Sequence, residues 1–259
     1  MSEGRVALAI EGPIARVSFD RPGAHNAMTW AMYEELSAIC ESLRNDKSVK
    51  VAMFRGEGGK SFVSGTDIGQ LGEIADGAGG LAYEARIDAW IGRLERLPQP
   101  TLALIDGWAV GGGLALAAAC DFRLATADAK FGAPMARTIG NCYSPANTKR
   151  LLAAFGAARA KRILMLGEMI GAEEAKSCGF VLDIVEANAL NERATQLVAR
   201  LLENAPLTVR ASKEMIRRIS HGEIHYDGVD LIAAVYGSED FRTGVRAFKA
   251  RTRPTWRGR

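Results

Sequence analysis

Hydrophobic spacing in the N-terminal part of the chain changes from alternating to helical. Residues 6–10 and 14–19 are short apolar or alternating runs on either side of Glu11-Gly12-Pro13, which predicts two strands joined by a tight turn. Thr29 can then cap a helix that ends at residues 45–46. The apolar positions of this helix recur at helical spacing, at Met32, Leu36, Ile39 and Leu43.

Short apolar runs followed by glycine-rich turns recur through the middle of the chain. Residues 49–54 and 101–105 are candidate buried strands, and each leads into a glycine turn. Between them, residues 69–80 are rich in glycine and alanine, which indicates a mobile segment, and residues 81–97 are expected to form a helix. Residues 122–125 are a further candidate strand. The loose repeat of strand, glycine turn and helix favours an α/β spiral over a Rossmann sheet.

The rest of the chain has mostly helical spacing, and only residues 181–185 look like a strand. Helices are expected over residues 147–155, 157–166, 172–177, 188–204, 206–219, 228–235 and 244–250. Pro206 stands at the favoured first position of its helix. We expect two parts: a spiral core of residues 1–204 and a C-terminal helical oligomerisation region of residues 205–259.

Composition narrows the class of protein. With 259 residues, 48% of them hydrophobic, the chain can bury a full core. The formal charge of +3 gives no electrostatic case for nucleic acid or an anionic membrane surface, although a small polyanionic ligand remains possible. Four scattered cysteines without a CxxC pair, and three dispersed histidines (His25, His221, His225), indicate reduced thiols and no metal site. Without a visible targeting signal or membrane span, we expect a soluble cytoplasmic protein.

Two glycine turns are candidates for ligand binding through the backbone. In Ser61-Phe62-Val63-Ser64-Gly65-Thr66-Asp67-Ile68, Gly65 permits an unusual bend that exposes a backbone N–H, and Asp67 can hold that bend by accepting from local amides. The alternative is an ordinary surface turn in which Asp67 starts a helix.

The second turn is Gly111-Gly112-Gly113, which follows a strand and opens the apolar helix that leads to Cys120. Glycines there allow a ligand to approach the backbone, and the first-turn N–H groups with the helix dipole favour negative charge. The alternative is that the glycines serve only tight helix packing. A phosphate loop is excluded, since there is no Gly-Lys-Ser/Thr and no GxGxxG spacing.

Three segments together carry a family resemblance. SFVSGTDI resembles the FxAGxDI segment of the crotonase (enoyl-CoA hydratase/isomerase) superfamily, and GWAVGGG resembles its NGYAxGGG segment. Arg21-Pro22 followed by His25-Asn26-Ala27-Met28 resembles its RPxxxNAL segment. The similarity runs from about Arg16 to the C-terminus and implies a crotonase-like ββα spiral with a C-terminal helical region.

The resemblance also implies a ligand and its contacts: an acyl-CoA thioester, with no cofactor apart from the CoA of the substrate, bound by a homotrimer or homohexamer. It places two oxyanion donors at the backbone amides of Ser64 and Gly112, and losing one such donor typically costs about 3 kcal/mol. The other expected substrate contacts are Ala24, Gly65, Thr66, Asp67, Ile68, Gly111, Met135 and Arg137. The basic residues Lys249, Arg251 and Arg253 could meet the CoA phosphates or could simply be solvated.

The chain departs from the family pattern where hydratases carry two glutamates. Those positions are Ala115 and Met135, and neither side chain can move a proton. The following loop also differs: Tyr143 and Cys142 could exchange a proton, and Arg137 could neutralise a substrate carboxylate. Alternatively, these residues only rebuild the loop and cap the helix at Asn147. The nearby acidic residues Glu73, Glu84 and Asp88 are expected to be solvated.

Three hypotheses follow for function. The first is an acyl-CoA isomerase, decarboxylase or other lyase that stabilises a thioester enolate and uses a proton donor other than glutamate. The second is a catalytically degenerate acyl-CoA-binding or scaffold protein. The third, a serine hydrolase on a similar spiral, is the weakest, because Ser64 lacks a GxSxG elbow and the histidines lie outside the turns that would hold a base.

Overall fold

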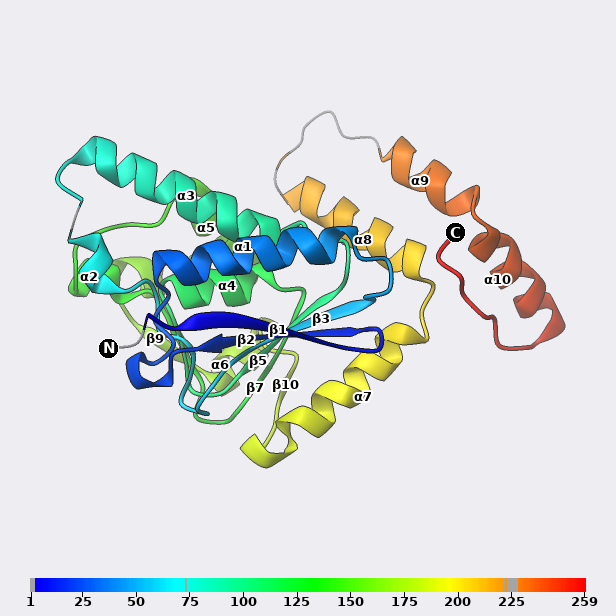
Figure 1. Ribbon diagram of the computed structural model, residues 1–259, viewed down its shortest axis with the longest axis horizontal. Helices are drawn as coiled ribbons and strands as arrows, with labels where there is room; N and C mark the ends of the chain where they lie inside the picture. Colours follow the sequence, from blue (N-terminus) through cyan, green and yellow to red (C-terminus); the bar gives the residue numbers. More distant parts are fainter. Residues whose placement is uncertain (1–2, 73, 221, 223–227) are drawn as a thin grey trace.

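The computed structural model describes residues 3–72, 74–220, 222 and 228–259 (Figure 1). Three residues named in the sequence analysis lie outside the described residues: Glu73, His221 and His225. The chain opens with an antiparallel hairpin of β1 (Arg5–Glu11) and β2 (Ile14–Asp20). Helix α1 (Trp30–Asn45) follows, and the Thr29 side chain accepts from the Met32 amide at its start. Both strands, the cap and the helix end are confirmed.

Two sheets form the core of the fold. The larger has the order β1-β2-β3-β5-β7-β10, in which β3 (Val51–Gly56), β5 (Thr101–Ile105), β7 (Phe122–Ala125) and β10 (Asp183–Ile184) are parallel to their neighbours. The smaller has the order β4-β6-β8-β9, with β4 (Ser61–Val63), β6 (Trp108–Val110), β8 (Lys130–Gly132) and β9 (Met169–Gly171).

The chain alternates between these sheets, and this alternation produces the spiral. Each of β3, β5 and β7 is followed by a short strand of the smaller sheet, namely β4, β6 and β8, before the chain turns into a helix. The three helices that follow these pairs most directly are α2 (Ile68–Leu71), α4 (Gly112–Ala119) and the 3₁₀ turn η2 (Pro134–Arg137). The predicted ββα spiral is confirmed.

The larger sheet is buried on both faces, which explains why its strands read as continuous apolar runs. Ala52, Phe54, Ala103 and Ile105 face the cluster under α1, α3 (Gly77–Glu95), α4 and α5 (Pro145–Met165). The alternate positions of the same strands pack on the opposite face against α7 (Leu190–Leu202), as Figure 1 shows. This second cluster includes Val51, Met53, Leu102, Leu104 and Leu124.

Some predicted boundaries were wrong. Helix α3 begins at Gly77, within the segment that its glycines marked as mobile, because Asp76 caps it by accepting from the Gly79 amide at 2.8 Å. By contrast, the two helices predicted on either side of Gly156 are confirmed: both lie within α5, and Gly156 between them is not helical, with φ of +69°. The remaining short elements are η1 (Pro22–Ala24), α6 (Ala172–Ser177) and η3 (Ala187–Ala189).

The C-terminal part consists of α8 (Pro206–Ser220), α9 (Val229–Tyr236) and α10 (Glu239–Ala250). Lys213 joins α8 to the core by donating to Asp121 Oδ2 at 2.7 Å and to the Gln99 carbonyl at 2.9 Å. In Figure 1, α9 and α10 lie at the end of the molecule opposite α2. Among the helices of the described residues, none has the length and apolar character needed to cross a membrane.

Candidate active site

A cavity of about 410 Å³ lies at the first turns of α2 and α4, beneath α3. Its wall includes nine residues that the sequence singled out: Ser64, Gly65, Thr66, Asp67, Ile68, Gly111, Gly112, Met135 and Tyr143. A second cavity of about 550 Å³ shares Ile68, Tyr83 and Glu84 with the first and adds Cys142. The two glycine turns therefore meet at one site.

Asn26 explains how the first turn is built. Its side chain is fully buried: Oδ1 accepts from the Arg21 amide at 2.9 Å, and Nδ2 donates to the carbonyls of Glu57 and Ser61. Its backbone is in the left-handed region at φ +57°, which asparagine tolerates better than most residues. The asparagine of the early motif thus fastens the loop after β2 to the turn that precedes β4.

Arg21 and Asp67 form the charged contact of this turn. Arg21 Nη1 donates to Asp67 Oδ2 at 2.5 Å and to the Ala27 carbonyl at 3.1 Å. The hydrogen bond from Arg21 lowers the pKa of Asp67 against the opposing effect of partial burial. The other Asp67 oxygen accepts from the Gly69 amide at 2.8 Å and caps α2. Both sequence interpretations of Asp67 are therefore correct, since it holds the bend and starts a helix.

The Ser64 amide is not available to a ligand, which corrects the first predicted donor. It donates to the His25 carbonyl at 3.1 Å, while the Ser64 hydroxyl lies 3.4 Å from the Ala24 carbonyl. The amides of Gly65 and Thr66 remain in this turn, because Asp67 N donates to the Met28 carbonyl, and the Thr66 amide is the one that lies beside Gly112. Among the described residues, none accepts from Thr66 N.

Gly112 supplies the second amide. It is the first residue of α4, so its N–H has no acceptor within the helix. A Cβ added at Gly112 would lie 3.6 Å from Thr66 N, which places the two amides side by side. The neighbouring glycine has a different role: a Cβ at Gly113 would lie 1.9 Å from the Val63 carbonyl, so packing alone requires it. The packing explanation for the glycine triplet is therefore correct at Gly113, whereas ligand binding at Gly112 stays a prediction.

Three tyrosines surround the amide pair. Thr66 Oγ1 lies 3.0 Å from Tyr33 Oη and 3.2 Å from Tyr83 Oη. Tyr143 Oη donates to the Gly111 carbonyl at 2.5 Å. Burial raises the pKa of each phenol, so all three stay protonated at neutral pH. Neither Tyr33 nor Tyr83 could be predicted as a site residue from the sequence, because a tyrosine on an apolar helix face usually indicates core packing.

The predicted proton donors Tyr143 and Cys142 occupy different surroundings. Tyr143 lines the cavity of the amide pair, whereas Cys142 is exposed and lines only the second cavity. Ala24 and Arg137 line neither cavity. Arg137 is an exposed residue of η2 beside Gly167, so its predicted place in the substrate site is not supported.

Glu84 is not solvated as expected. It is half-buried, lines both cavities, and its Oε2 accepts from the Ser144 amide at 2.9 Å. Asp88, one helical turn further, accepts from Ser144 Oγ at 2.7 Å and from Asn147 Nδ2 at 3.2 Å. Burial raises the pKa of Glu84, and the proximity of Asp88 adds to this shift, although the Ser144 amide opposes it. Ser144 also caps α5, so the two carboxylates of α3 hold the start of that helix.

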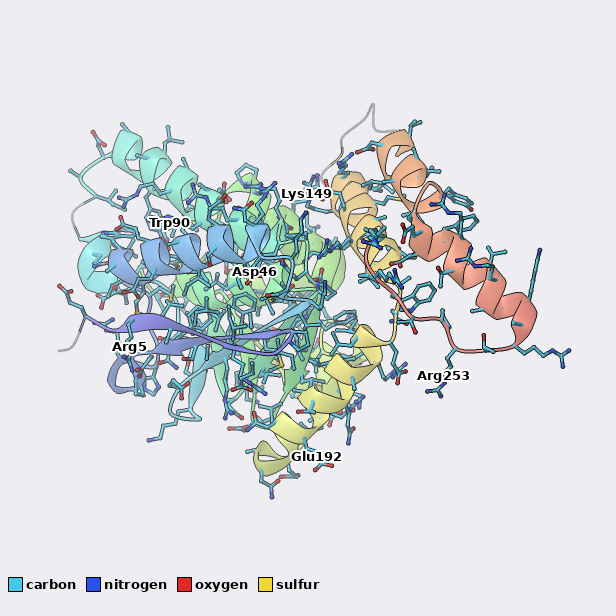
Figure 2. All side chains as sticks on the ribbon, turned by 45° about the vertical axis from the view of Figure 1, so that its right-hand side comes forward. Arg5, Asp46, Trp90, Lys149, Glu192 and Arg253 are labelled. Atoms are coloured by element: carbon cyan, nitrogen blue, oxygen red, sulfur yellow. The ribbon has the colours of Figure 1, made fainter. Side chains whose placement is uncertain are left out.

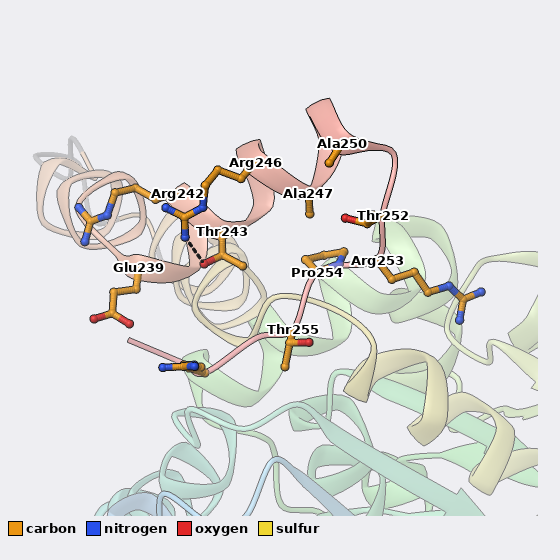
Figure 3. A pocket seen from close by; sticks show the side chains of 11 residues that line it. Glu239, Arg242, Thr243, Arg246, Ala247, Ala250, Thr252, Arg253, Pro254 and Thr255 are labelled. Carbon is orange, nitrogen blue, oxygen red and sulfur yellow. Dashed lines mark hydrogen bonds between the residues drawn. The ribbon is translucent and has the colours of Figure 1, made fainter.

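The basic C-terminal residues form a cavity of their own. It measures about 840 Å³ and is lined by Arg242, Arg246, Arg253 and Arg257, among others (Figure 3). Of the three residues predicted to meet CoA phosphates, only Arg253 lines it. Figure 2 shows Arg253 far from Trp90, which stacks on Tyr33 near the amide pair. Within one chain, the arginine cavity and the amide pair are therefore separate.

No group of three or more histidine, cysteine or acidic side chains in the described part of the chain is arranged to hold a metal ion. The four cysteines are free thiols.

The fold is the crotonase fold. A crystal structure titled as an enoyl-CoA hydratase/carnithine racemase from Magnetospirillum magneticum matches with a TM-score of 0.90 at 30% identity, over 98% of this chain and 96% of that one. The model of the family described as Enoyl-CoA hydratase/isomerase matches residues 9–259. The chain therefore belongs to the enoyl-CoA hydratase/isomerase family of acyl-CoA enzymes.

Relatives of similar length include proteins named as hydratases. The (E)-benzylidenesuccinyl-CoA hydratase of Thauera aromatica is 34% identical over 258 residues, which cover 98% of this chain and 99% of that protein. The short-chain-enoyl-CoA hydratase of Clostridium acetobutylicum is 33% identical over 225 residues, which cover 84% of this chain and 83% of that protein.

Proposed function

We propose that this protein binds an acyl-CoA thioester and stabilises its enolate with the backbone amides of Thr66 and Gly112. The observation that carries the proposal is the convergence of these two N–H groups on one wall of a cavity, neither with an acceptor among the described residues. The thioester oxygen becomes negative as the enolate forms, and the start of α4 favours that charge. Donors that act on developing charge each contribute about 3 kcal/mol to the transition state.

We further propose that the enolate serves an isomerisation, a decarboxylation or another lyase step rather than the addition of water. The family resemblance assigns the two hydratase glutamates to the positions of Ala115 and Met135. Ala115 is fully buried within α4 and Met135 lines the cavity with an apolar side chain, so neither can activate water. Decarboxylation suits such a site, since the departing carboxylate generates the enolate without a strong base.

The test is to incubate the protein with enoyl-, malonyl- and β-hydroxyacyl-CoAs and follow the products by mass spectrometry. We expect a shifted double bond or loss of CO₂ from at least one substrate. Rapid hydration of enoyl-CoAs would contradict the proposed chemistry. Tight binding of every thioester without turnover would instead support the second candidate function, an acyl-CoA-binding protein that has lost catalysis. Ala115 and Met135, which cannot transfer protons, also favour this candidate.

We propose that residues 205–259 form a helical region through which the protein assembles into trimers or hexamers. Large apolar side chains are exposed along its helices: Ile216, Ile219, Val229, Ile232, Tyr236 and Phe248. Phe248 is 86% exposed and Met165, at the end of α5 in the core, is 71% exposed. Sedimentation velocity should give an oligomer for the natural chain and for Met165→Asp, and a smaller species for Phe248→Asp. A monomeric natural chain would contradict the proposal.

A further inference from the structure

Two carboxylates, Asp67 and Glu84, are present among the described residues that line the cavity of the amide pair. Asp67 is committed to its ion pair with Arg21, and its two oxygens hold the turn and the start of α2. A carboxylate fixed in this way as an anion exchanges protons poorly at neutral pH. Asp67 is therefore unsuited to proton transfer, which leaves Glu84 as the candidate among these two carboxylates.

Glu84 differs from Asp67 in each of these respects. No cation in the described part of the chain pairs with it: Arg86, two residues further along α3, pairs with Glu34, and the residue one helical turn from Glu84 is another acid, Asp88. One of its oxygens accepts from the Ser144 amide, which fixes the side chain, while no described donor binds the other oxygen. Burial raises its pKa toward neutrality, which is the direction that suits a group alternating between acid and base.

The position of Glu84 also connects it to the amide pair. It follows Tyr83, whose hydroxyl reaches Thr66 Oγ1, and it lines both cavities where they join. Thr66, in the turn before α2, and Glu84, on α3, thus line the same cavity.

We propose that Glu84 is the catalytic residue that exchanges a proton with the α-carbon of the bound thioester. The inference rests on the function proposed above. In the base direction, the α C–H bond breaks, its proton passes to Glu84, and its electron pair moves to the thioester oxygen held by Thr66 and Gly112. In the acid direction, the enolate collapses and protonated Glu84 returns a proton to the α-carbon or, for a dienolate, to the γ-carbon.

The test separates this proton transfer from ligand binding. Binding is measured by calorimetry with butyryl-CoA, and exchange of α-protons is measured by NMR with vinylacetyl-CoA in deuterium oxide. Glu84→Gln keeps an oxygen that can accept from the Ser144 amide, so the fold is expected to remain intact. Asp88→Asn is the matched control, because Asp88 also binds Ser144 but does not line the cavity.

We expect Glu84→Gln to lower the exchange rate by about 100-fold or more, the usual contribution of a positioned acid or base. Butyryl-CoA affinity should be unchanged, and Asp88→Asn should exchange like the natural protein. The role of Glu84 would be overturned, while the proposed function stands, if Glu84→Gln exchanged α-protons at the full rate. The same holds if its exchange rate and its affinity for butyryl-CoA fell by the same factor. A natural protein that binds butyryl-CoA without exchanging protons would also overturn it. Failure of the natural protein to bind butyryl-CoA would refute the proposed function itself.

Discussion

Gly112 offers a direct test of the arrangement around the amide pair. A Cβ at this residue would lie 2.6 Å from Tyr33 Oη and 3.4 Å from Thr66 Oγ1. The tyrosine has little freedom to yield, because it is fully buried and stacks on Trp90 with ring centroids 5.0 Å apart. We therefore expect Gly112→Ala to displace either the start of α4 or the tyrosine ring.

The expected magnitude follows from two opposing terms. Overpacking a filled core costs about 1–3 kcal/mol, whereas alanine gains at most about 1 kcal/mol over glycine in a helix. Gly112→Ala should thus lower the free energy of unfolding by about 1 to 2 kcal/mol. In a Tyr33→Phe background the clashing oxygen is gone, and the nearest remaining atom is Thr66 Oγ1 at an ordinary contact distance of 3.4 Å. The same alanine should then cost little, although Tyr33→Phe itself loses a hydrogen bond worth about 1 kcal/mol.

Urea unfolding of the natural protein, both single variants and the double variant, followed by tryptophan fluorescence, measures this coupling. The double variant should be more stable than the sum of the two single effects predicts. If Gly112→Ala costs the same with tyrosine or phenylalanine at residue 33, the hydroxyl does not border Gly112, and the geometry assigned to the amide pair is wrong.

Two further predictions concern the neighbouring contacts. Arg21→Met should lower the free energy of unfolding at pH 7 by about 2 kcal/mol, the typical value of a hydrogen bond to a charged group. Arg21 lowers the pKa of Asp67 in the folded state, so this ion pair stabilises the protein above the ordinary carboxyl pKa and loses its effect as pH falls through the lowered pKa. The free energy of unfolding of Arg21→Met, measured in urea, should therefore vary less with pH below about 4 than that of the natural protein. Tyr143→Phe should lose about 1 kcal/mol of stability with its bond to the Gly111 carbonyl and should slow turnover, whereas Cys142→Ala should change neither; equal effects in both would refute the distinction between them.

Much of the fold could be predicted because its signals are local. Strands β3 and β5 of the larger sheet are each an apolar run followed by a glycine turn, and that repeat favoured a spiral over a Rossmann sheet. The capping threonine before α1 and the alternation of β2 fixed two more elements. The start of α3 was missed although Asp76 is a typical N-cap residue, since the glycines after it argued against a helix. At the start of α3, the low helix propensity of the glycines was outweighed by the Asp76 cap and by packing of the helix on the core.

The amide donors could be located only to within a turn. A glycine turn exposes several N–H groups, and which of them remains free depends on acceptors brought by distant residues. Here Asn26 fixes the loop so that the His25 carbonyl accepts from Ser64 N, and the Met28 carbonyl accepts from Asp67 N. Of the two amides left between them, that of Thr66 lies beside Gly112. No spacing within SFVSGTDI encodes that choice.

Glu84 illustrates the same limit for side chains. In the sequence it is an acid on a helix of mixed polarity, for which solvation is the ordinary expectation. Its burial arises because Ser144, sixty residues away, presents an amide and a hydroxyl to α3, and the two carboxylates there satisfy both. A structural contact of this kind keeps one oxygen of Glu84 fixed, while the other has no donor among the described residues. The position of Glu84 therefore depends on Ser144, in a loop sixty residues further along the chain, and the acid–base role proposed for Glu84 depends on that contact.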